Sequence, residues 1–250
     1  MARINNLTNF LTDVATAIKT KKGDNTPIPA SNFDTEITNL PSGGGNENAI
    51  IDFGLIGKTG TNSKYINYAI TKVPNFDATD YTSFKDMFKN CSNLENVVIT
   101  NTSSVVDMSG MFSGCYELIT IPSLDTSSAT NMSSMFNGCS KLTTISGLDT
   151  SSATNTSNMF NNCYELTTIP VFDLGKVVTG TNMRYMFSGC RKLNTTSLDN
   201  ILQSCISATS YTGTKTLYYL GLRNNYYPTS TIQSLPHYQD FINAGWTIGY

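Results

Sequence analysis

The chain has 250 residues, of which 39% are hydrophobic and only 14% are charged, and its formal net charge is −2. This length suits one large domain or two modest ones, and the near-neutral balance excludes the basic surface by which proteins bind nucleic acid or anionic membranes. No stretch approaches the roughly 20 apolar residues of a membrane span, and the first residues lack the apolar core of a secretory signal. We therefore expect no nucleic-acid partner, no membrane insertion and no secretion by the general route.

The first forty residues predict a small helical unit. Within residues 3–21, apolar side chains recur at the three-and-four spacing of one helix face. This apolar face comprises Leu7, Phe10, Leu11, Val14 and Ile18. A second short helix is expected to end near Leu40. A unit of this size, residues 1–41, cannot bury its apolar face alone, so we expect it to dock on a partner protein or on copies of itself.

Residues 42–46 are rich in glycine and predict a flexible linker, and residues 47–80 predict a β-rich cap for the N-terminal end of a repeat region. Two apolar runs in this cap, 49–56 and 65–70, are typical of strands. The turn between them contains Gly57-Lys58-Thr59, which is part of a phosphate-binding loop motif. That motif requires a glycine five residues before Gly57, where this chain has Asp52, so a hairpin turn is the better interpretation.

A fivefold repeat occupies residues 81–198. Each copy has Met-Phe, then Cys three positions after the Phe, then Leu three positions after the Cys. Its methionines are Met87, Met111, Met135, Met159 and Met186, so the period is 24 residues except for a final 27. A fixed period in this range is typical of a solenoid in which each repeat is one coil. Three extra residues lie between Asp173 and Met183, and we expect this insertion to bulge outward as a loop.

Each coil is predicted to contain a short helix and a short parallel strand. In the third copy, Met132, Met135, Phe136 and Cys139 fit one helical face, and residues 142–145 alternate as a strand does. The fold class is therefore an α/β repeat, a leucine-rich-repeat-like solenoid with a small N-terminal helical anchor. Inside it we expect Met, Phe, Cys, Leu and Ile.

Five of the six cysteines hold the same position in successive copies: Cys91, Cys115, Cys139, Cys163 and Cys190. Equivalent inward positions of stacked coils predict a column of small buried side chains. No second ligand lies at the short spacing that a zinc site needs. We expect free structural thiols, including Cys205 outside the repeat, and no metal or cofactor. Free thiols agree with folding in a reducing cytosol.

Residues 199–250 are predicted to cap the last coil. The pattern indicates a helix over 198–205, a strand over 216–222, and a helix over 234–245 that Gly245 ends. Aromatic residues near the end, Trp246 among them, are expected to seal the last coil.

The phrase from Met111 to Ser127 resembles the BspA-like leucine-rich repeats, whose members usually bind proteins or glycans and carry no catalytic motif. The opening helix followed by Ile28-Pro29-Ala30 resembles the N-terminal segment of tail proteins from Firmicutes phages and prophages. The C-terminal segments around Asn200, 210–217 and 244–247 resemble those of repeat proteins in the same setting. The resemblance implies a virion protein made in the host cytoplasm.

An enzyme is disfavoured by the residues themselves. His237 is the only histidine, and no nucleophile motif accompanies it. Asp125, Asp149 and Asp173 recur at one position of the repeat, which indicates turn residues. A glycosidase carboxylate pair stays an alternative, because separation in space is not visible in a sequence.

A binding module explains more of the sequence. The residues just after each repeat cysteine vary between copies and combine tyrosine with charge, as contact surfaces do. The candidate binding residues are Tyr116, Glu117, Lys141, Tyr164, Glu165 and Arg191. The simpler interpretation of any one of them is a solvated side chain at the rim of its coil.

We therefore expect a phage virion protein that binds a host-surface protein or glycan through the solenoid. Its N-terminal helices would attach it to other virion proteins. The alternatives are a capsid or tail decoration protein without a receptor and a bacterial surface adhesin. Self-association is left open.

Overall fold

The computed structural model of the chain describes residues 76–79, 81–121, 123–145, 147–216 and 226–248. The chain divides into two units, Met1–Glu47 and Asn48–Tyr250, and the described residues all belong to the second. The predicted anchor with Leu7, Phe10, Leu11, Val14 and Ile18 lies outside the described residues. So do the linker, the cap up to residue 75 and most of the strand expected at 216–222.

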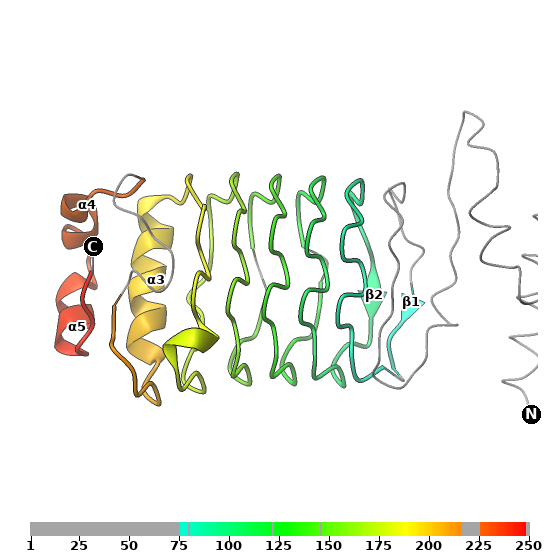
Figure 1. Cartoon of the computed structure of the whole chain (residues 1–250), viewed down its shortest axis with the longest axis horizontal. Coiled ribbons are helices and arrows are strands. Elements are labelled where there is room, and N and C mark those ends of the chain that lie inside the picture. Colours follow the sequence, from blue (N-terminus) through cyan, green and yellow to red (C-terminus); the bar gives the residue numbers. More distant parts are fainter. Residues whose placement is uncertain (1–75, 80, 122, 146, 217–225, 249–250) are drawn as a thin grey trace, which may run out of the picture. The chain divides into compact units, whose positions relative to one another are not determined.

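From Phe76 to Leu193 the chain forms a row of coils, each hydrogen-bonded to the next (Figure 1). Strand β1 (Phe76–Asp77) pairs in parallel with β2 (Ile99–Thr100), with Phe76 opposite Ile99. Further along the row, single parallel bridges join Thr120, Thr144 and Thr168, and a second series joins Ser83, Asp107, Asn131 and Asn155. Each coil therefore contributes only one or two residues to a ladder before it turns.

The Met-Phe segments form consecutive turns, and the short helix expected in each coil is wrong. The N–H of Phe112 donates to Met135 O in the next coil (2.8 Å), and the N–H of Gly114 donates to Asn137 O (2.7 Å). Between them, Cys115 N–H donates three residues back to Phe112 O (3.1 Å). An α-helix needs every N–H to donate four residues back within the same segment, so these amides are not available for one.

Two residues in each Met-Phe segment have positive φ, and they lie four positions apart. The pairs are Asp86 and Asn90, Gly110 and Gly114, Ser134 and Gly138, Asn158 and Asn162, and Tyr185 and Gly189. The left-handed residue donates its own N–H to the neighbouring coil, as Gly110 N–H does to Ser133 O (2.8 Å), and the N–H after it donates three residues back, as Met111 N–H does to Met108 O (3.3 Å). Glycine adopts this conformation at no steric cost, and asparagine tolerates it better than most residues, which explains the Gly-Cys and Asn-Cys dipeptides of the repeat.

The core consists of inward columns, and the side chains expected there are buried. Every Met-Phe pair of the repeat is at most 1% exposed. Phenylalanine rings of adjacent coils stack with centroids 5.3 to 5.8 Å apart and planes within 12° of parallel. The stacked rings are Phe88, Phe112, Phe136, Phe160 and Phe187.

All six cysteines are free and buried, as predicted. Four of them donate a hydrogen bond from Sγ to a carbonyl of the preceding coil, for example Cys139 to Phe112 O at 3.2 Å. Burial raises the pKa of five thiols, which belong to Cys115, Cys139, Cys163, Cys190 and Cys205. These thiols stay protonated, and those of Cys115, Cys139, Cys163 and Cys190 serve as weak hydrogen-bond donors inside the core.

Helix α3 (Thr195–Ser207) lies against the last coil (Figure 1). Serine hydroxyls of this helix accept hydrogen bonds from backbone N–H groups at the open edge of the coils. Ile169 N–H donates to Ser197 Oγ (3.1 Å), and Phe172 N–H donates to Ser204 Oγ (2.8 Å). The helix begins three residues earlier than the sequence indicated, because the Asn194 side chain accepts a hydrogen bond from Ser197 N–H at its start.

The inserted residues contain a 3₁₀ helix, η3 (Gly180–Asn182), and the coil ladder continues beyond it, with Thr156 N–H donating to Asn182 O at 2.7 Å. Beyond α3 lie α4 (Thr229–Gln233) and α5 (Tyr238–Asn243), where a single helix over 234–245 was expected. Gly245 follows α5 with φ +84°, in agreement with its predicted stop role. No helix in the described ranges is both long and apolar enough to span a bilayer.

Candidate binding site

The residues directly after each repeat cysteine lie on the rim of the coils. Cys115 and Leu118 both point inward, and a turn joins them, with Leu118 N–H donating to Cys115 O (3.3 Å). The two residues between them must therefore face outward. Tyr116 is 52% exposed and Tyr164, two coils later, is 38% exposed. The six candidate residues from the sequence thus occupy equivalent turns along one edge.

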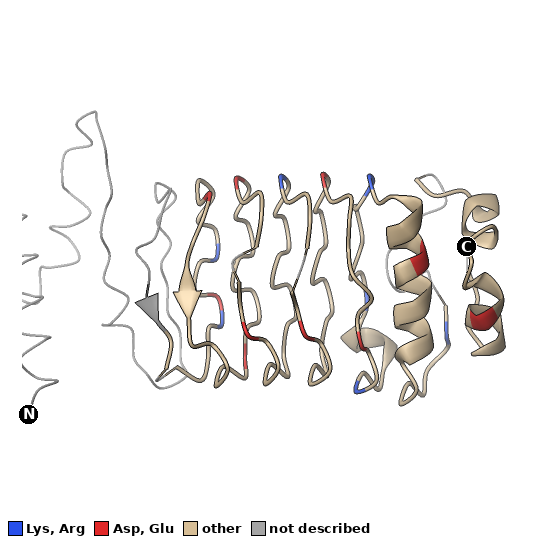
Figure 2. Ribbon diagram, turned by 180° about the vertical axis from the view of Figure 1, so that it is seen from behind, with Lys and Arg blue, Asp and Glu red and all other residues tan. Residues whose placement is uncertain are grey.

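Charged side chains on this edge pair across neighbouring coils. Lys141 Nζ lies 2.5 Å from Glu117 Oε2, and Lys192 Nζ lies 2.6 Å from Glu165 Oε2. Figure 2 shows acidic and basic residues following one another at the tips of these turns. Such exposed pairs contribute at most about 1 kcal/mol each. Their main consequence is that the four charges neutralise one another along the edge.

Next to the charged tips runs a groove with a volume of about 480 Å³ that crosses four coils. Its lining consists of Asn90, Ser113, Gly114, Tyr116, Asn137, Gly138, Ser140, Asn162 and Tyr164. Of the candidate residues, it brings together the two tyrosines. Glu117, Lys141, Glu165 and Arg191 are not among its lining residues.

Small residues create the space between the tyrosines. Ser140 holds the position in its coil that Tyr116 and Tyr164 hold in the coils on either side. Gly138, with φ +79°, forms part of the floor, and the nearest atoms to a Cβ placed there would be 3.7 Å away, Tyr116 Cε1 among them. The tyrosine therefore leans over the backbone of the next coil. The groove exists because bulky and small residues alternate along the edge.

Asparagine side chains also lie over the glycines of the following coil. A Cβ on Gly114 would come within 2.7 Å of Asn90 Oδ1, and one on Gly189 within 2.9 Å of Asn162 Oδ1. The sequence did not single out these asparagines. Their role depends on residues 24 or 27 positions away, and the only local signal is that they alternate with glycine before the repeat cysteine.

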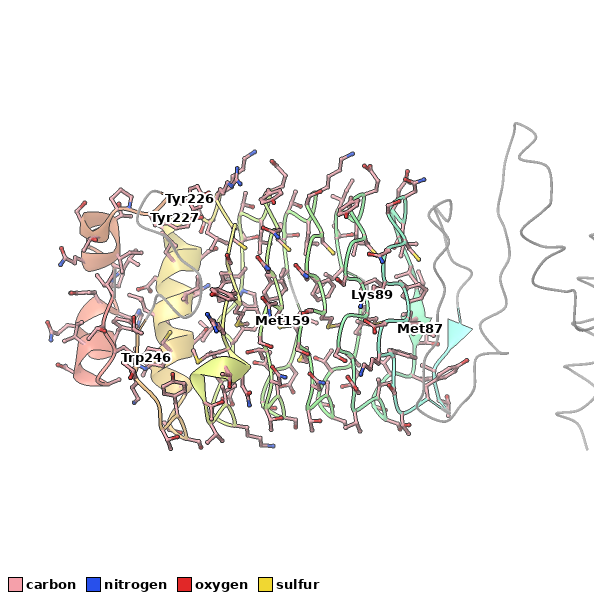
Figure 3. The ribbon with its side chains drawn as sticks, in the orientation of Figure 1. Met87, Lys89, Met159, Tyr226, Tyr227 and Trp246 are labelled. Atoms are coloured by element: carbon pink, nitrogen blue, oxygen red, sulfur yellow. The ribbon has the colours of Figure 1, made fainter. Side chains whose placement is uncertain are left out.

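Arg191 closes one end of the edge. Its guanidinium carbon lies 4.6 Å from the centroid of the Tyr164 ring and 5.3 Å from that of Tyr226, so it makes cation–π contacts with both. Tyr227 fixes this segment: its hydroxyl accepts Leu193 N–H (2.8 Å) and donates to Cys190 O (2.6 Å). Burial raises the pKa of Tyr227 to about 12. Figure 3 shows Tyr226 and Tyr227 side by side near the last coil.

A second cavity of about 580 Å³ lies near the N-terminal coils. It is lined by residues 96–103 together with Ile121, Ser123 and Asp125. Of the sequence candidates it contains only Asp125, and seven of its eleven lining residues have polar side chains.

The repeated aspartates act as turn residues, as the sequence indicated. Asp125 accepts a hydrogen bond from Ser127 N–H (3.1 Å), Asp149 from Ser151 N–H (2.8 Å) and Asp173 from Gly175 N–H (2.8 Å). The hydrogen bonds from the serines two residues ahead lower the pKa of Asp125 and of Asp149.

His237 is bound to a carboxylate next to the C-terminal helices. Its Nδ1 lies 2.7 Å from Asp199 Oδ2, and its backbone N–H donates to Asp199 Oδ1 (2.9 Å). This pair ties the start of α5 to α3. Among the residues that the structure describes, no three His, Cys, Asp or Glu side chains gather closely enough to hold a metal ion.

Residues 82–201 match the family model described as "Mycoplasma protein of unknown function, DUF285". The domain that this family model describes is of the Mycoplasma type and is related to BspA-like repeat proteins. The matched segment coincides with the coils and the first half of α3. No curated protein and no solved structure matches the chain.

Proposed function

We propose that this chain is a non-catalytic binding protein of a phage particle. Its coils would form a leucine-rich-repeat-like solenoid of the BspA type that displays the tyrosine groove to the host cell surface. The observation that carries the proposal is the groove itself, in which two exposed tyrosines and several amides and hydroxyls converge on successive turns. Tyrosine is strongly enriched at binding hot spots, because it offers a large contact area at low entropic cost.

Binding fits the groove better than catalysis does. The nine lining residues are Asn, Ser, Gly and Tyr, so none of them is a histidine, carboxylate, lysine or cysteine. A serine or tyrosine is a weak nucleophile unless an adjacent base activates it, and the lining supplies no histidine, carboxylate, lysine or cysteine for that role. His237, which pairs with Asp199, lies at the C-terminal helices and not in the groove, and Glu117 and Glu165 beside the groove are paired with lysines.

The coil architecture suits a displayed contact surface. The inward residues of each coil are fixed by packing, whereas the rim residues can change without disturbing the core. A family of related chains could then share one scaffold and differ in ligand. This supports recognition, but by itself it does not favour a protein ligand over a glycan.

The proposed location on a phage particle rests on the sequence alone. The apolar face of residues 7–18, the Gly-rich linker 42–46 and the resemblance of both ends to phage tail proteins support it. Residues 1–41 would then attach the protein to other virion proteins after synthesis in the host cytoplasm. The alternatives are a decoration protein without a receptor, for which the groove would have no use, and a bacterial surface adhesin.

The binding function is tested with the purified full chain and cells of the strain that carries the gene. We expect saturable binding that the double variant Tyr116→Ala/Tyr164→Ala abolishes. Ile119→Ala is the matched control, because Ile119 is also 51% exposed, lies on the same coil and is not part of the groove lining. Equal binding by wild type and the double variant would refute a role for the groove.

The particle location is tested separately by deleting residues 1–46 and by electron microscopy of particles labelled at the C-terminus. We expect the truncated chain to be absent from purified particles and the label to lie at the tail. Co-purification of the truncated chain would show that the anchor assignment is wrong. A label spread over the head would favour the decoration alternative.

A further inference from the structure

We infer that the tyrosine groove binds an uncharged oligosaccharide. This inference deepens the proposed function and rests on it, because it names the ligand class of the same site. It follows from the charge of the groove, from the state of its backbone amides and from the spacing of its two rings.

The first step concerns charge. None of the nine lining residues carries a charge. The flanking charged residues form ion pairs, Glu117 with Lys141 and Glu165 with Lys192. Arg191 lies over the ring of Tyr164, and Lys89, the chain neighbour of the lining residue Asn90, pairs with Asp86. An anionic ligand such as a sialylated or sulfated glycan needs an available cation to offset its desolvation. The groove therefore favours a ligand without charge.

The second step concerns the backbone. An extended peptide commonly binds by adding a strand to free backbone groups. In this groove the amides are used between coils: Asn90 N–H donates to Ser113 O, Gly114 N–H to Asn137 O and Gly138 N–H to Asn161 O, each at 2.7 Å. A peptide would find no ladder to join along these positions. What the lining offers instead is side-chain amides, hydroxyls and aromatic rings.

The third step concerns the polar side chains. Within the described part of the chain, the amide groups of Asn90, Asn137 and Asn162 make no hydrogen bond, so their donors and acceptors face solvent. A side-chain amide carries two donors and an acceptor, which matches the paired hydroxyls of a sugar. Pockets for small polar ligands combine such groups with aromatic walls. The lining of the groove has both.

The fourth step concerns spacing. The stacked rings of Phe112, Phe136 and Phe160 are 5.5 and 5.7 Å apart, so equivalent side chains two coils apart lie about 11 Å from each other. Tyr116 and Tyr164 are equivalent in this sense. That interval exceeds the width of one pyranose ring, so the two tyrosines suit two sugar units of one linear chain. The ligand is accordingly an oligosaccharide and not a monosaccharide.

The test uses the full chain on a microarray that carries neutral oligosaccharides beside sialylated and sulfated ones. We expect binding to neutral glycans, stronger for longer chains, with an affinity that changes little between about 50 mM and about 500 mM salt. Tyr116→Ala should weaken binding about tenfold or more, the loss expected for a hot-spot side chain. Ile119→Ala and the charge-removing pair Glu117→Gln/Lys141→Gln should bind as wild type does.

A blocking variant keeps the inference falsifiable if an alanine variant folds poorly. Ser140→Tyr adds a ring to the gap between Tyr116 and Tyr164, and because Ser140 lies on the rim it should fold normally and lose neutral-glycan binding. Binding to anionic glycans alone, binding to no glycan of the array, or undiminished binding by Ser140→Tyr would overturn the inference.

Failure of the inference is distinguishable from failure of the proposed function. Host cells are treated with periodate, which cleaves vicinal diols of glycans, or with protease. Groove-dependent cell binding that survives periodate and disappears after protease would refute the glycan and leave the binding function intact. Loss of binding after periodate alone is the result that the inference requires.

Discussion

Truncation of Phe136 to alanine tests the column packing on which the coils depend. Phe136 is fully buried, and its ring stacks on Phe112 at 5.5 Å with planes 9° apart and on Phe160 at 5.7 Å with planes 3° apart. Removing a buried phenylalanine ring costs about 3–5 kcal/mol through lost transfer free energy and the cavity left behind. Since both ring faces lose a stacking partner, worth about 0.5–1.5 kcal/mol per pair, we expect the upper half of that range.

The measurement is urea-induced unfolding of the full chain, which gives the free energy of unfolding from the midpoint and the slope. A loss of about 4 kcal/mol is a large fraction of the 5–15 kcal/mol typical of a folded domain, so the midpoint should fall strongly. Phe136→Leu should lie between wild type and Phe136→Ala, because leucine fills much of the space but cannot stack. Ile119→Ala should change the free energy by no more than about 0.5 kcal/mol.

A loss of less than about 1 kcal/mol for Phe136→Ala would refute this reasoning. It would mean either that neighbouring side chains fill the space left by the ring without a cost in free energy, or that the stacked rings do not hold the coils together. A changed slope with an unchanged midpoint would point instead to altered compactness of one of the two states.

Three further predictions concern the glycines, the capping helix and the thiols. Gly114→Ala should destabilise the chain more than Gly138→Ala. Both residues have positive φ, but only at Gly114 does the new Cβ come within 2.7 Å of Asn90 Oδ1. Equal losses of the free energy of unfolding in urea would contradict this. Ser204→Ala should cost about 1–3 kcal/mol, because it leaves the buried N–H of Phe172 without an acceptor, and replacement of the exposed Ser210 provides the control. The five thiols with raised pKa should resist alkylation in the native state. Below about pH 9 they should not affect the free energy of unfolding, and above it that free energy should fall by about 1.4 kcal/mol per thiol and pH unit, because only the unfolded chain then loses their protons. A free energy of unfolding that stays constant up to about pH 11 would argue against their burial.

The interior of the coils could be predicted from the sequence because burial selects residue type strongly. Side chains at a given inward position face the same environment in every coil, so Met, Phe, Cys and Leu recur at the repeat period and are buried in the structure. The free state of the cysteines was predicted from the same repetition, since one inward position filled by cysteine in five coils is typical of small buried side chains.

The local backbone of each coil could not be predicted in the same way. Met132, Met135, Phe136 and Cys139 have helical spacing, yet Ser134 and Gly138 take positive φ and break any helix there. Hydrophobic spacing reports which residues face inward and not which turns bring them there. The overlooked signal was the glycine or asparagine directly before every repeat cysteine, which marks a left-handed position.

The serine hydroxyls by which α3 caps the coils could not be predicted, because their contacts join residues far apart in the sequence. Ser197 and Ser204 are ordinary polar residues in the sequence, but in α3 they take the place of the backbone that a further coil would have offered to Ile169 and Phe172. An exposed edge with unpaired amides invites association with another chain, so covering it with hydroxyls ends the stack at a defined point.

The candidate groove could be predicted only in part, for a related reason. The tyrosines stand out in the sequence because each comes directly after a repeat cysteine. The space between them exists because Gly114 and Gly138 have no side chain and because Ser140 is small. A sequence displays the residues that contact a ligand more readily than those that leave room for it. In a stack of near-identical coils, a coil with a small residue at the tyrosine position therefore shapes the groove as much as the coils with a tyrosine there.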